Sequence, residues 1–381
     1  MKTEWIDNNQ QCTMNNVQWR KVKLGEVCED IFSGRNTKRN DFGKYVVFGS
    51  TGLIGYSDTY EYDFDAILVA RVGANAGLVN IASGLYDVSD NTLIIKLGET
   101  IILDYLYFLL IQINLNQYIF GSGQPLVTAG LLKNLEISIP SLPVQRRIAA
   151  ILSSADKVIA STQKVIDKLK QIKQGMMDDL LKPKDGWRMV KLGECCERIT
   201  DGSHDSPKSE INGYYMPSVK DMTYNSFDFT NCKKISTSDY LRLKNMGCKP
   251  EVGDVLIAKD GSILKYCFVM KEDIPIVVLS SIAILKPNIN IIESQYLAYF
   301  FQKQDVVTDV IENYKSGTGV PRIVLRNFSE IAISFPPDLS EQRRISTILS
   351  GIDSKIAAEK KVLEKYKAVK KGLMEELLNG N

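Results

Sequence analysis

The sequence predicts a mixed α/β protein that consists of two related domains, each followed by a long helix. Residues 19–26 read WRKVKLGE, and residues 187–194 repeat them as WRMVKLGE. Residues 145–148 read QRRI, and this motif returns at residues 342–345. Two motifs that recur in the same order indicate an internal duplication. The distance between them is longer in the second copy, so that copy carries insertions between matched ends.

Each copy ends in a segment that we expect to be a long helix of a coiled coil. The two segments are rich in Lys, Glu, Asp, Gln and Ala, and their apolar residues recur at heptad spacing, which is typical of a coiled coil. In the first helix one column comprises Ile148, Ala155, Thr162, Leu169 and Met176, and the other comprises Ile151, Val158, Val165 and Ile172. The second helix offers Ile345, Ile348, Ile352, Ile356, Leu363 and Tyr366, while Lys355 and Glu359 interrupt its frame.

The region before each helix has mixed α/β character. Buried strands that enter a turn are predicted at 66–73 and 254–261, and short helices at 105–115 and 296–305. Glycine-rich loops follow at 121–125 and 316–321, and strands that end at proline at 135–140 and 331–336. The predicted order is a domain (1–142), a helix (143–182), a domain (183–337) and a helix (338–381).

Length and composition favour a soluble protein with more than one domain. A chain of 381 residues exceeds what one hydrophobic core usually supports. Its 44% hydrophobic and 24% charged residues are those of a globular protein. Residues 1–7 hold no apolar signal core, and the apolar run 105–113 is too short to span a bilayer, so we expect a cytoplasmic protein without membrane contact. The seven cysteines lack paired metal spacing and are expected to be free, buried thiols.

Taken together, these motifs resemble the specificity subunits of type I restriction–modification systems, from residue 19 to about residue 378. The resemblance rests on the WxxVxLGE-like opening of each half, the glycine loop, and the proline-containing strand end that leads into QRRI and a long helix. It implies two target-recognition domains joined by an antiparallel coiled coil. It also implies that the domains read the two halves of a bipartite site in double-stranded DNA, that two modification (methyltransferase) subunits dock on the assembly, and that restriction subunits can join them.

The motifs of a self-sufficient enzyme are missing. No G-x-x-x-x-G-K-[S/T] phosphate loop occurs, which excludes a translocating ATPase of that type. Residues 335–338 (FPPD) lack the amide and the aromatic residue of a methyltransferase adenine-pocket motif, and we interpret them as a strand end. His204 is the only histidine and is expected in an exposed loop. We therefore predict no catalytic residue, no metal and no cofactor.

DNA contacts are then expected from loops of the two domains. Residues 33–40 (SGRNTKRN) combine cations with amides, the mixture used for phosphates and base edges. The candidates in the first domain are Arg35, Lys38, Arg39, Arg71, Asn75 and Gln124. Those in the second domain are Lys220, Lys259, Lys315 and Arg322. For any one of them a solvated surface charge is an equally good interpretation.

Two physical arguments bear on this hypothesis independently of the resemblance. Two diverged domains in one chain permit an asymmetric site, whereas a homodimeric reader demands a palindrome. The net charge of +2 is small for a protein that grips DNA alone, so partners are expected to supply part of the phosphate contact. The alternatives are a coiled-coil scaffold whose α/β domains bind ligands such as peptides or sugars, and a self-sufficient enzyme. Divergence of the two domains favours DNA recognition over a scaffold.

Overall fold

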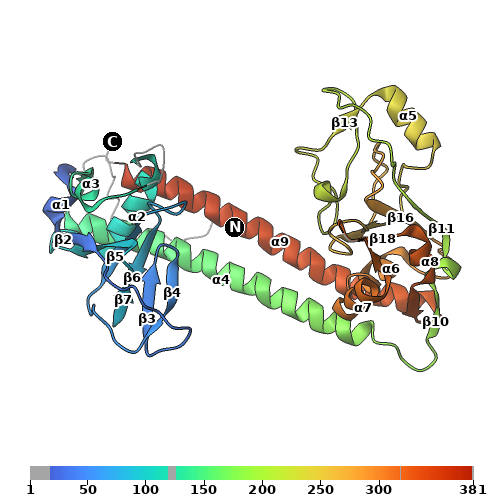
Figure 1. The fold of residues 1–381 in the computed structure, drawn as a ribbon, viewed down its shortest axis with the longest axis horizontal. Coiled ribbons are helices and arrows are strands. Elements are labelled where there is room, and N and C mark those ends of the chain that lie inside the picture. The colour runs from blue at the N-terminus through green and yellow to red at the C-terminus, as the bar shows by residue number, and fades with distance from the viewer. Residues whose placement is uncertain (1–17, 119–125, 318, 380–381) are drawn as a thin grey trace, which may run out of the picture. The chain divides into compact units, whose positions relative to one another are not determined.

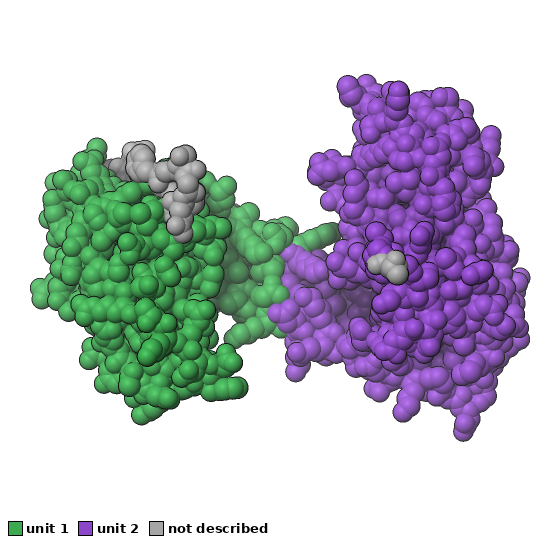
Figure 2. All heavy atoms as spheres, in the orientation of Figure 1, with its two compact units in different colours: residues 1–164, 361–381 green, residues 165–360 purple. Residues whose placement is uncertain are grey.

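The computed structural model describes residues 18–118, 126–317 and 319–379. The chain divides into two compact units, one comprising Met1–Lys164 with Lys361–Asn381 and the other Val165–Lys360. Figure 2 shows the two units in different colours. Each unit therefore contains one globular domain together with a part of each long helix. The two units are described separately below.

The domain of the first unit is built on a four-stranded antiparallel sheet with strand order β2-β8-β5-β6 (Figure 1). Its strands are β2 (Cys28–Ser33), β8 (Thr92–Leu97), β5 (Ala66–Ala70) and β6 (Val79–Ala82). Every residue of β5 is buried, because both faces of the sheet are covered. Ile67 and Val69 join the core formed with the helices, whereas Leu68 joins a second core under a smaller sheet. Burial on both faces explains why this strand is apolar throughout rather than alternating.

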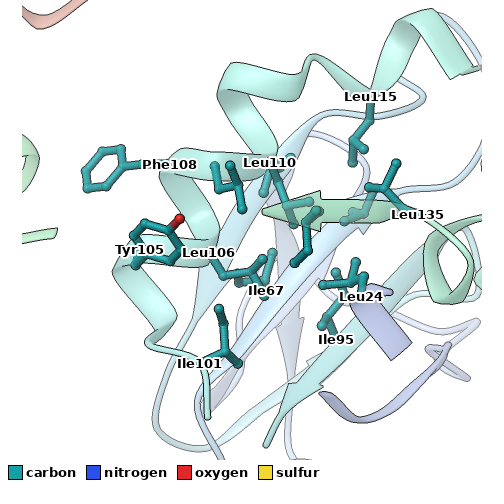
Figure 3. Close-up of a cluster of buried hydrophobic side chains, with 14 of the residues drawn as sticks. Leu24, Ile67, Ile95, Ile101, Tyr105, Leu106, Phe108, Leu110, Leu115 and Leu135 are labelled. Atoms are coloured by element: carbon teal, nitrogen blue, oxygen red, sulfur yellow. The ribbon is translucent and has the colours of Figure 1, made fainter. Parts of the chain in front are cut away.

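The two covering layers come from different parts of the domain. One face carries α2 (Leu103–Ile113), and Figure 3 shows Leu106 of this helix beside Ile67 of β5. The other face carries a three-stranded sheet of β4 (Gly52–Ser57), β3 (Tyr45–Gly49) and β7 (Tyr86–Val88). The remaining elements are β1 (Arg20–Lys23), α1 (Leu24–Val27), η2 (Leu115–Tyr118), α3 (Ala129–Lys133) and β9 (Glu136–Ile139).

The domain of the second unit repeats this plan. Its central antiparallel sheet has the order β11 (Cys196–Asp201), β16 (Ile282–Pro287), β14 (Val255–Ala258) and β15 (Cys267–Val269). Helices around it are η3 (Leu192–Glu194), α6 (Ser294–Phe300), α7 (Gln304–Tyr314) and α8 (Leu325–Glu330). The closing strands are β10 (Arg188–Lys191) and β19 (Ala332–Phe335). Between the core strands lie β12 (Tyr214–Tyr215), η4 (Val219–Asp221), β13 (Lys234–Ile235) and α5 (Thr237–Asn245), and the hairpin of β17 (Lys315–Ser316) and β18 (Arg322–Ile323) follows α7.

The opening motif of each copy docks the start of the domain onto its end. In the first domain β1 pairs antiparallel with β9, and the fully buried Leu24 donates its backbone N–H to the carbonyl of Leu135 at 2.8 Å. In the second domain β10 pairs with β19, and Leu192 donates to the carbonyl of Ile331 at the same distance. The repeated Lys-Leu-Gly-Glu segment is therefore a structural joint, which explains why it recurs in both copies.

The glutamine of each QRRI motif joins the domain to its long helix. Gln145 is buried, accepts the backbone N–H of Ile102 at 2.9 Å, and donates to the carbonyls of Thr100 at 3.2 Å and Pro140 at 3.0 Å. Gln342 is also buried and makes the same three bonds, with Glu293 at 2.8 Å, Ile291 at 3.1 Å and Pro336 at 2.9 Å. The motif was visible in the sequence as a repeat, but its bonding partners were not.

The two long helices are α4 (Leu142–Leu180) and α9 (Leu339–Leu378), within a few residues of the predicted ranges 143–182 and 338–381. In the first unit Ile148 and Leu152 near the start of α4 share a core with Met374 and Leu377 near the end of α9. In the second unit the contacts reverse, and the end of α4 joins the start of α9 through Met177, Ile345 and Leu349. The predicted antiparallel pairing is therefore present within each unit.

One predicted column of the coiled-coil seam needs correction. Val158, Val165 and Ile172 are each more than 40% exposed, while Leu152 and Ile166, which occupy the column one residue further along, are buried. Because both columns are apolar over much of α4, the choice between them depends on where the partner helix packs. The other predicted seam residues lie as follows: Ile148, Ile345, Ile356 and Leu363 are buried, Ile151, Ala155, Leu169, Ile348 and Ile352 are half-buried, and Tyr366 is exposed.

Two further details differ from the prediction. The helix expected over 296–305 is two helices, α6 and α7, because the chain turns extended at Lys303, which caps α7 with φ −68° and ψ 130°. Helices α3 and α8 precede the proline-ended strands and were not predicted.

The glycine loop 121–125, with Gln124, lies outside the described residues. Within the part of the chain that the structure describes, no helix is long and apolar enough to cross a membrane.

Candidate nucleic-acid interface

A glycine opens the loop at the same end of each central sheet. Gly34 follows β2 and Gly202 follows β11. A Cβ atom on Gly34 would lie 2.4 Å from the carbonyl oxygen of Val88, and one on Gly202 would lie 2.0 Å from that of Val278. Only glycine allows this approach, so both domains fold the loop after the first central strand in the same way.

In the first domain this loop borders a polar pocket of about 740 Å³. The pocket is lined by residues of three segments: Asn36, Thr37, Lys38, Arg39 and Asn40 of the loop, Val47, Ser50, Thr51 and Ile54 of the β3–β4 hairpin, and Ser89, Asp90 and Asn91 before β8. Amides, hydroxyls and two cations dominate this lining. Such side chains offer the hydrogen-bond donors and acceptors that phosphates and base edges require.

Asn36 holds the loop in place. Its side-chain amide donates to the buried Asp87, and its Oδ1 accepts the backbone N–H of Lys38 at 2.6 Å. Lys38 and Arg39 consequently remain exposed at the pocket rim. Arg35 is exposed as well and lies 3.5 Å from Glu61. The structure thus places two of the three predicted cations of this loop, Lys38 and Arg39, at the pocket, whereas Arg35 pairs with Glu61.

Of the other candidates in the first domain, Arg71 lies next to this pocket. Arg71 follows β5, donates its backbone N–H to the carbonyl of Asn91 at 2.9 Å, and directs its guanidinium to Ser33 Oγ at 3.5 Å. Because Asn91 lines the pocket, Arg71 lies directly beside the pocket. Asn75 is exposed in the turn between β5 and β6, where its carbonyl accepts the N–H of Leu78.

The candidates of the second domain gather at the equivalent end of its sheet. Lys220 in η4 follows Val219, whose N–H donates to the hydroxyl of Ser281 at 3.2 Å. The carbonyl of Ser281 accepts the N–H of Lys259, and the carbonyl of Lys259 accepts the N–H of Ile323 beside Arg322. Lys315 pairs with Ile323 across the β17–β18 hairpin. Lys220, Lys315 and Arg322 are exposed.

Lys259 takes a different role from the predicted one. Its side chain is only 6% exposed, and its ammonium group lies 3.4 Å from Asp201 and 3.1 Å from Asp260. A cation that is buried between two carboxylates is not free to contact a DNA phosphate. This placement corrects the prediction for Lys259, because strand-end position alone did not reveal the acidic partners on β11 and on the following turn.

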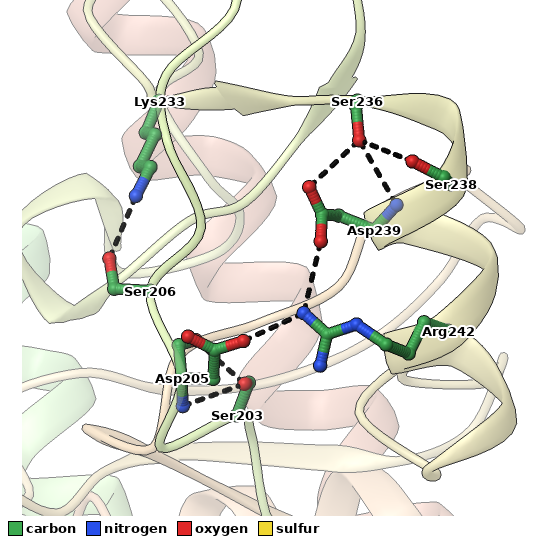
Figure 4. Close-up of polar contacts among 8 residues, drawn as sticks. All are labelled: Ser203, Asp205, Ser206, Lys233, Ser236, Ser238, Asp239 and Arg242. Carbon is green, nitrogen blue, oxygen red and sulfur yellow. Dashed lines mark hydrogen bonds and ion pairs between the residues drawn. The ribbon is translucent and has the colours of Figure 1, made fainter.

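The loop after Gly202 is hydrogen-bonded to α5, in the segment between the central strands of the second domain (Figure 4). Arg242 of α5 donates to Asp205 at 2.7 Å and to Asp239 at 3.0 Å, and the hydroxyl of Ser236 caps this helix. Hydrogen bonds from Arg242 and Ser236 hold the pKa of Asp239 below its ordinary value. Where the first domain presents Arg35, Lys38 and Arg39, this loop presents His204, Asp205 and Ser206 after the buried Ser203. The two domains therefore differ in charge at equivalent positions.

Two diverged copies of one α/β domain, each with a polar surface at the same end of its central sheet, define a two-domain recognition protein. The chain belongs to the family whose model is described as the type I restriction modification DNA specificity domain. That model matches twice, over residues 16–171 and 184–368. The match confirms the resemblance inferred from the repeated motifs.

Relatives agree with this assignment, and a solved structure shares the fold. The chain is 32% identical over 155 residues to the type I restriction enzyme EcoprrI specificity subunit of Escherichia coli, a match that spans 39% of each protein. It is 26% identical over 341 residues to the MjaVIII specificity subunit of Methanocaldococcus jannaschii, which covers 82% of this chain and 78% of that protein. The fold matches the crystal structure of the type I restriction–modification S subunit from M. genitalium, with a TM-score of 0.65 and 18% identity over 98% of both chains. The predicted fold class is thereby confirmed.

Proposed function

We propose that this chain is the DNA sequence-specificity subunit of a type I restriction–modification complex. Each domain contacts one half of a bipartite, asymmetric site in double-stranded DNA. The observation that carries the proposal is the pair of equivalent sheet ends, where the first domain holds a polar pocket flanked by Lys38 and Arg39 and the second holds Lys220 and Arg322. The different side chains at these two ends supply the chemistry for reading two different sequences.

In this proposal the chain does no chemistry of its own. Methylation and cleavage belong to two modification subunits and to restriction subunits that join the complex, all within the cytoplasm. The small net charge of +2 supports shared contact with DNA, because each phosphate contact adds to affinity through counterion release. A chain with this charge is expected to bind DNA weakly until its partners contribute cations.

A domain exchange tests the proposal directly. Residues 19–142 are replaced by the equivalent domain of another specificity subunit, and the chimera is expressed with its modification subunits. Sequencing of the methylated sites should show one half-site changed and the other retained. A change in both half-sites, or in neither, would contradict separate reading by the two domains.

A gel-shift comparison tests the contribution of partners. The chain is assayed on target DNA alone and with co-expressed modification subunits over a series of salt concentrations. We expect tighter binding and a steeper salt dependence with the subunits present, by about 0.9 in the log–log slope for every added phosphate contact. An unchanged slope would refute shared phosphate contact, and an absence of DNA binding in both samples would refute the proposed function.

A further inference from the structure

Two apolar side chains stand out at the surface of the two domains. Phe42 is 87% exposed and Ile211 is 90% exposed, the largest values for any large hydrophobic residue that the structure describes. Each lies shortly before a strand outside the central sheet: Phe42 precedes β3 in the first domain, and Ile211 precedes β12 in the second. An isolated exposed apolar residue is common, but a matched pair in a duplicated protein calls for a cause.

The strand pairing shows that the two residues occupy equivalent positions. Val46 of β3 pairs in parallel with Tyr86, two residues before Val88, and Tyr215 of β12 pairs in parallel with Ile276, two residues before Val278. Val88 and Val278 are equivalent because their carbonyls face Gly34 and Gly202. Tyr45 therefore corresponds to Tyr214, and Phe42 and Ile211 lie three residues before these tyrosines.

Both loops are anchored, so the exposure is built into the fold. Asn40 exchanges two backbone hydrogen bonds of 2.9 Å with Tyr56, and Glu210 donates to the carbonyl of Lys234 at 3.0 Å. The tyrosine after each tip packs on another ring, and the two ring pairs are Tyr45 with Tyr60 at 4.9 Å and Tyr214 with Tyr240, stacked at 4.0 Å. A fixed loop that presents an apolar side chain to water has no gain from that exposure in the free protein.

Both tips lie among charged residues of either sign, with Asp41 directly before Phe42 and Glu210 directly before Ile211. Lys38, Arg39 and Lys44 flank Phe42 in sequence, and Lys44 lies over the ring of Tyr45. Near Ile211, Lys234 lies over the ring of Tyr215 at 4.9 Å. A single apolar side chain within a charged and polar surface differs from a protein-docking face, which presents a contiguous apolar patch. It matches the wedges that DNA-binding proteins insert between base steps.

We propose that Phe42 and Ile211 act as apolar wedges, each inserted at one base step of the half-site that its own domain contacts. The proposal rests on the proposed DNA-recognition function and adds to it a deformation of the DNA. Insertion would partly unstack the bases and kink the duplex, and the step that unstacks most easily would be preferred. The wedges thus contribute to sequence selection without a hydrogen bond to any base.

The test uses the complete complex with its modification subunits and a duplex that carries its methylated target site. The fluorescent adenine analogue 2-aminopurine replaces each adenine of the site in turn, on either strand. The adenine that is methylated is left unchanged, so that unstacking by the modification subunits does not contribute to the signal. We expect fluorescence to rise on binding at one step in each half-site. Phe42→Ala should abolish the rise in one half-site and Ile211→Ala in the other, each with about a tenfold rise in Kd, because the apolar contact with the unstacked bases is lost.

Ile289→Ala is the matched control, because Ile289 is 66% exposed but lies beyond the opposite end of β16. It should leave both fluorescence signals and the Kd unchanged. Phe42→Leu, which keeps an apolar tip, should retain most of the signal. Loss of binding by the wild-type complex would refute the proposed function. Normal binding without a fluorescence rise, or a rise that survives both alanine variants, would refute the wedges alone.

Discussion

The ammonium group of Lys173 on α4 lies 2.8 Å from the carboxylate of Asp353 on α9, and 5.1 Å from the ring centre of Tyr299. In the first unit Lys370 of α9 lies 2.6 Å from Asp156 of α4, above the ring of Phe108 at 5.0 Å. Each helix thus contributes one aspartate and one lysine at equivalent positions of the repeat. Polar residues within a coiled-coil seam favour one register over others, at some expense of stability.

The first prediction concerns this register. Lys173→Met should lower the free energy of unfolding by about 2 kcal/mol, because Asp353, which also accepts the hydroxyl of Tyr299, loses its cationic hydrogen-bond donor in a partly buried site. Urea denaturation of the chain measures this. Lys170→Met, at a pair with more than half of each side chain exposed, is the control and should cost clearly less. Equal losses in the two variants would show that the seam pair has no special role.

The second prediction concerns the joint between domain and helix. Gln342→Leu should destabilise the second unit by about 3 kcal/mol, since it leaves the N–H of Glu293 and two carbonyls without their partner in a buried place. Hydrogen exchange at the start of α9 should accelerate in the variant. Arg343→Ala, one residue away and exposed, should leave both the exchange and the stability near wild type. Unchanged exchange in Gln342→Leu would argue against the joint.

The third prediction concerns the pocket of the first domain. Lys38→Gln and Arg39→Gln should each reduce the salt slope of DNA binding by about 0.9, measured by fluorescence anisotropy of the complex with modification subunits. Lys21→Gln, on β1 away from the pocket, should leave the slope unchanged. If all three variants behave alike, the pocket is not the contact surface.

The fourth prediction separates structure from binding in the second domain. Lys259→Met should lower the free energy of unfolding by about 3 kcal/mol, because Asp201 and Asp260 lose the cation buried between them. Adding Asp201→Asn should recover part of this loss. At a temperature where the variant is folded, its salt slope for DNA should match the wild type, whereas the exposed Lys220→Gln should lower it. A reduced salt slope for Lys259→Met would support the phosphate contact that was predicted from the sequence.

The fifth prediction concerns the thiols. Burial raises the pKa of Cys28 and Cys196 to about 12 and that of Cys195 and Cys232 to about 11, and it also raises the pKa of Cys248 and Cys267. In a Cys12→Ser chain, which leaves these six, reaction with a disulfide reagent at pH 8 should be at least about 100-fold slower than after unfolding, because few thiolates form. Rapid reaction of any of the six in the folded chain would contradict the raised pKa of its thiol.

The same pKa shifts set the direction of the pH dependence of stability. The folded-state values lie above the unfolded value of 9.0, so their contribution is complete below pH 9 and declines as the unfolded thiols ionise between about pH 9 and 12. Urea denaturation at pH 8 and pH 10 should show lower stability at the higher pH. Replacing Cys28 and Cys196 by alanine should reduce this pH difference.

The sequence alone determined the duplication, the two domains and the two long helices. Motifs that recur in order are visible without any structure, and heptad spacing needs only the helical period. Heptad spacing also located one column of the coiled-coil seam. Ile148 of that column is buried and Leu169 is half-buried. The placement of Lys38 and Arg39 at one pocket followed from their place in one short loop.

Tertiary structure decided what depends on residues far apart in the chain. The second seam column falls on Leu152 and Ile166 because α9 packs against that side of α4, and the apolar pattern is satisfied equally well by the neighbouring column. Lys259 is buried because Asp201, from another strand of the sheet, lies beside it. Phe42 and Ile211 share no motif, and only the pairing of β3 and β12 with distant strands places them at one position of the repeat. Local pattern specifies an element and its period, but the face that the element buries is set by the partner it meets.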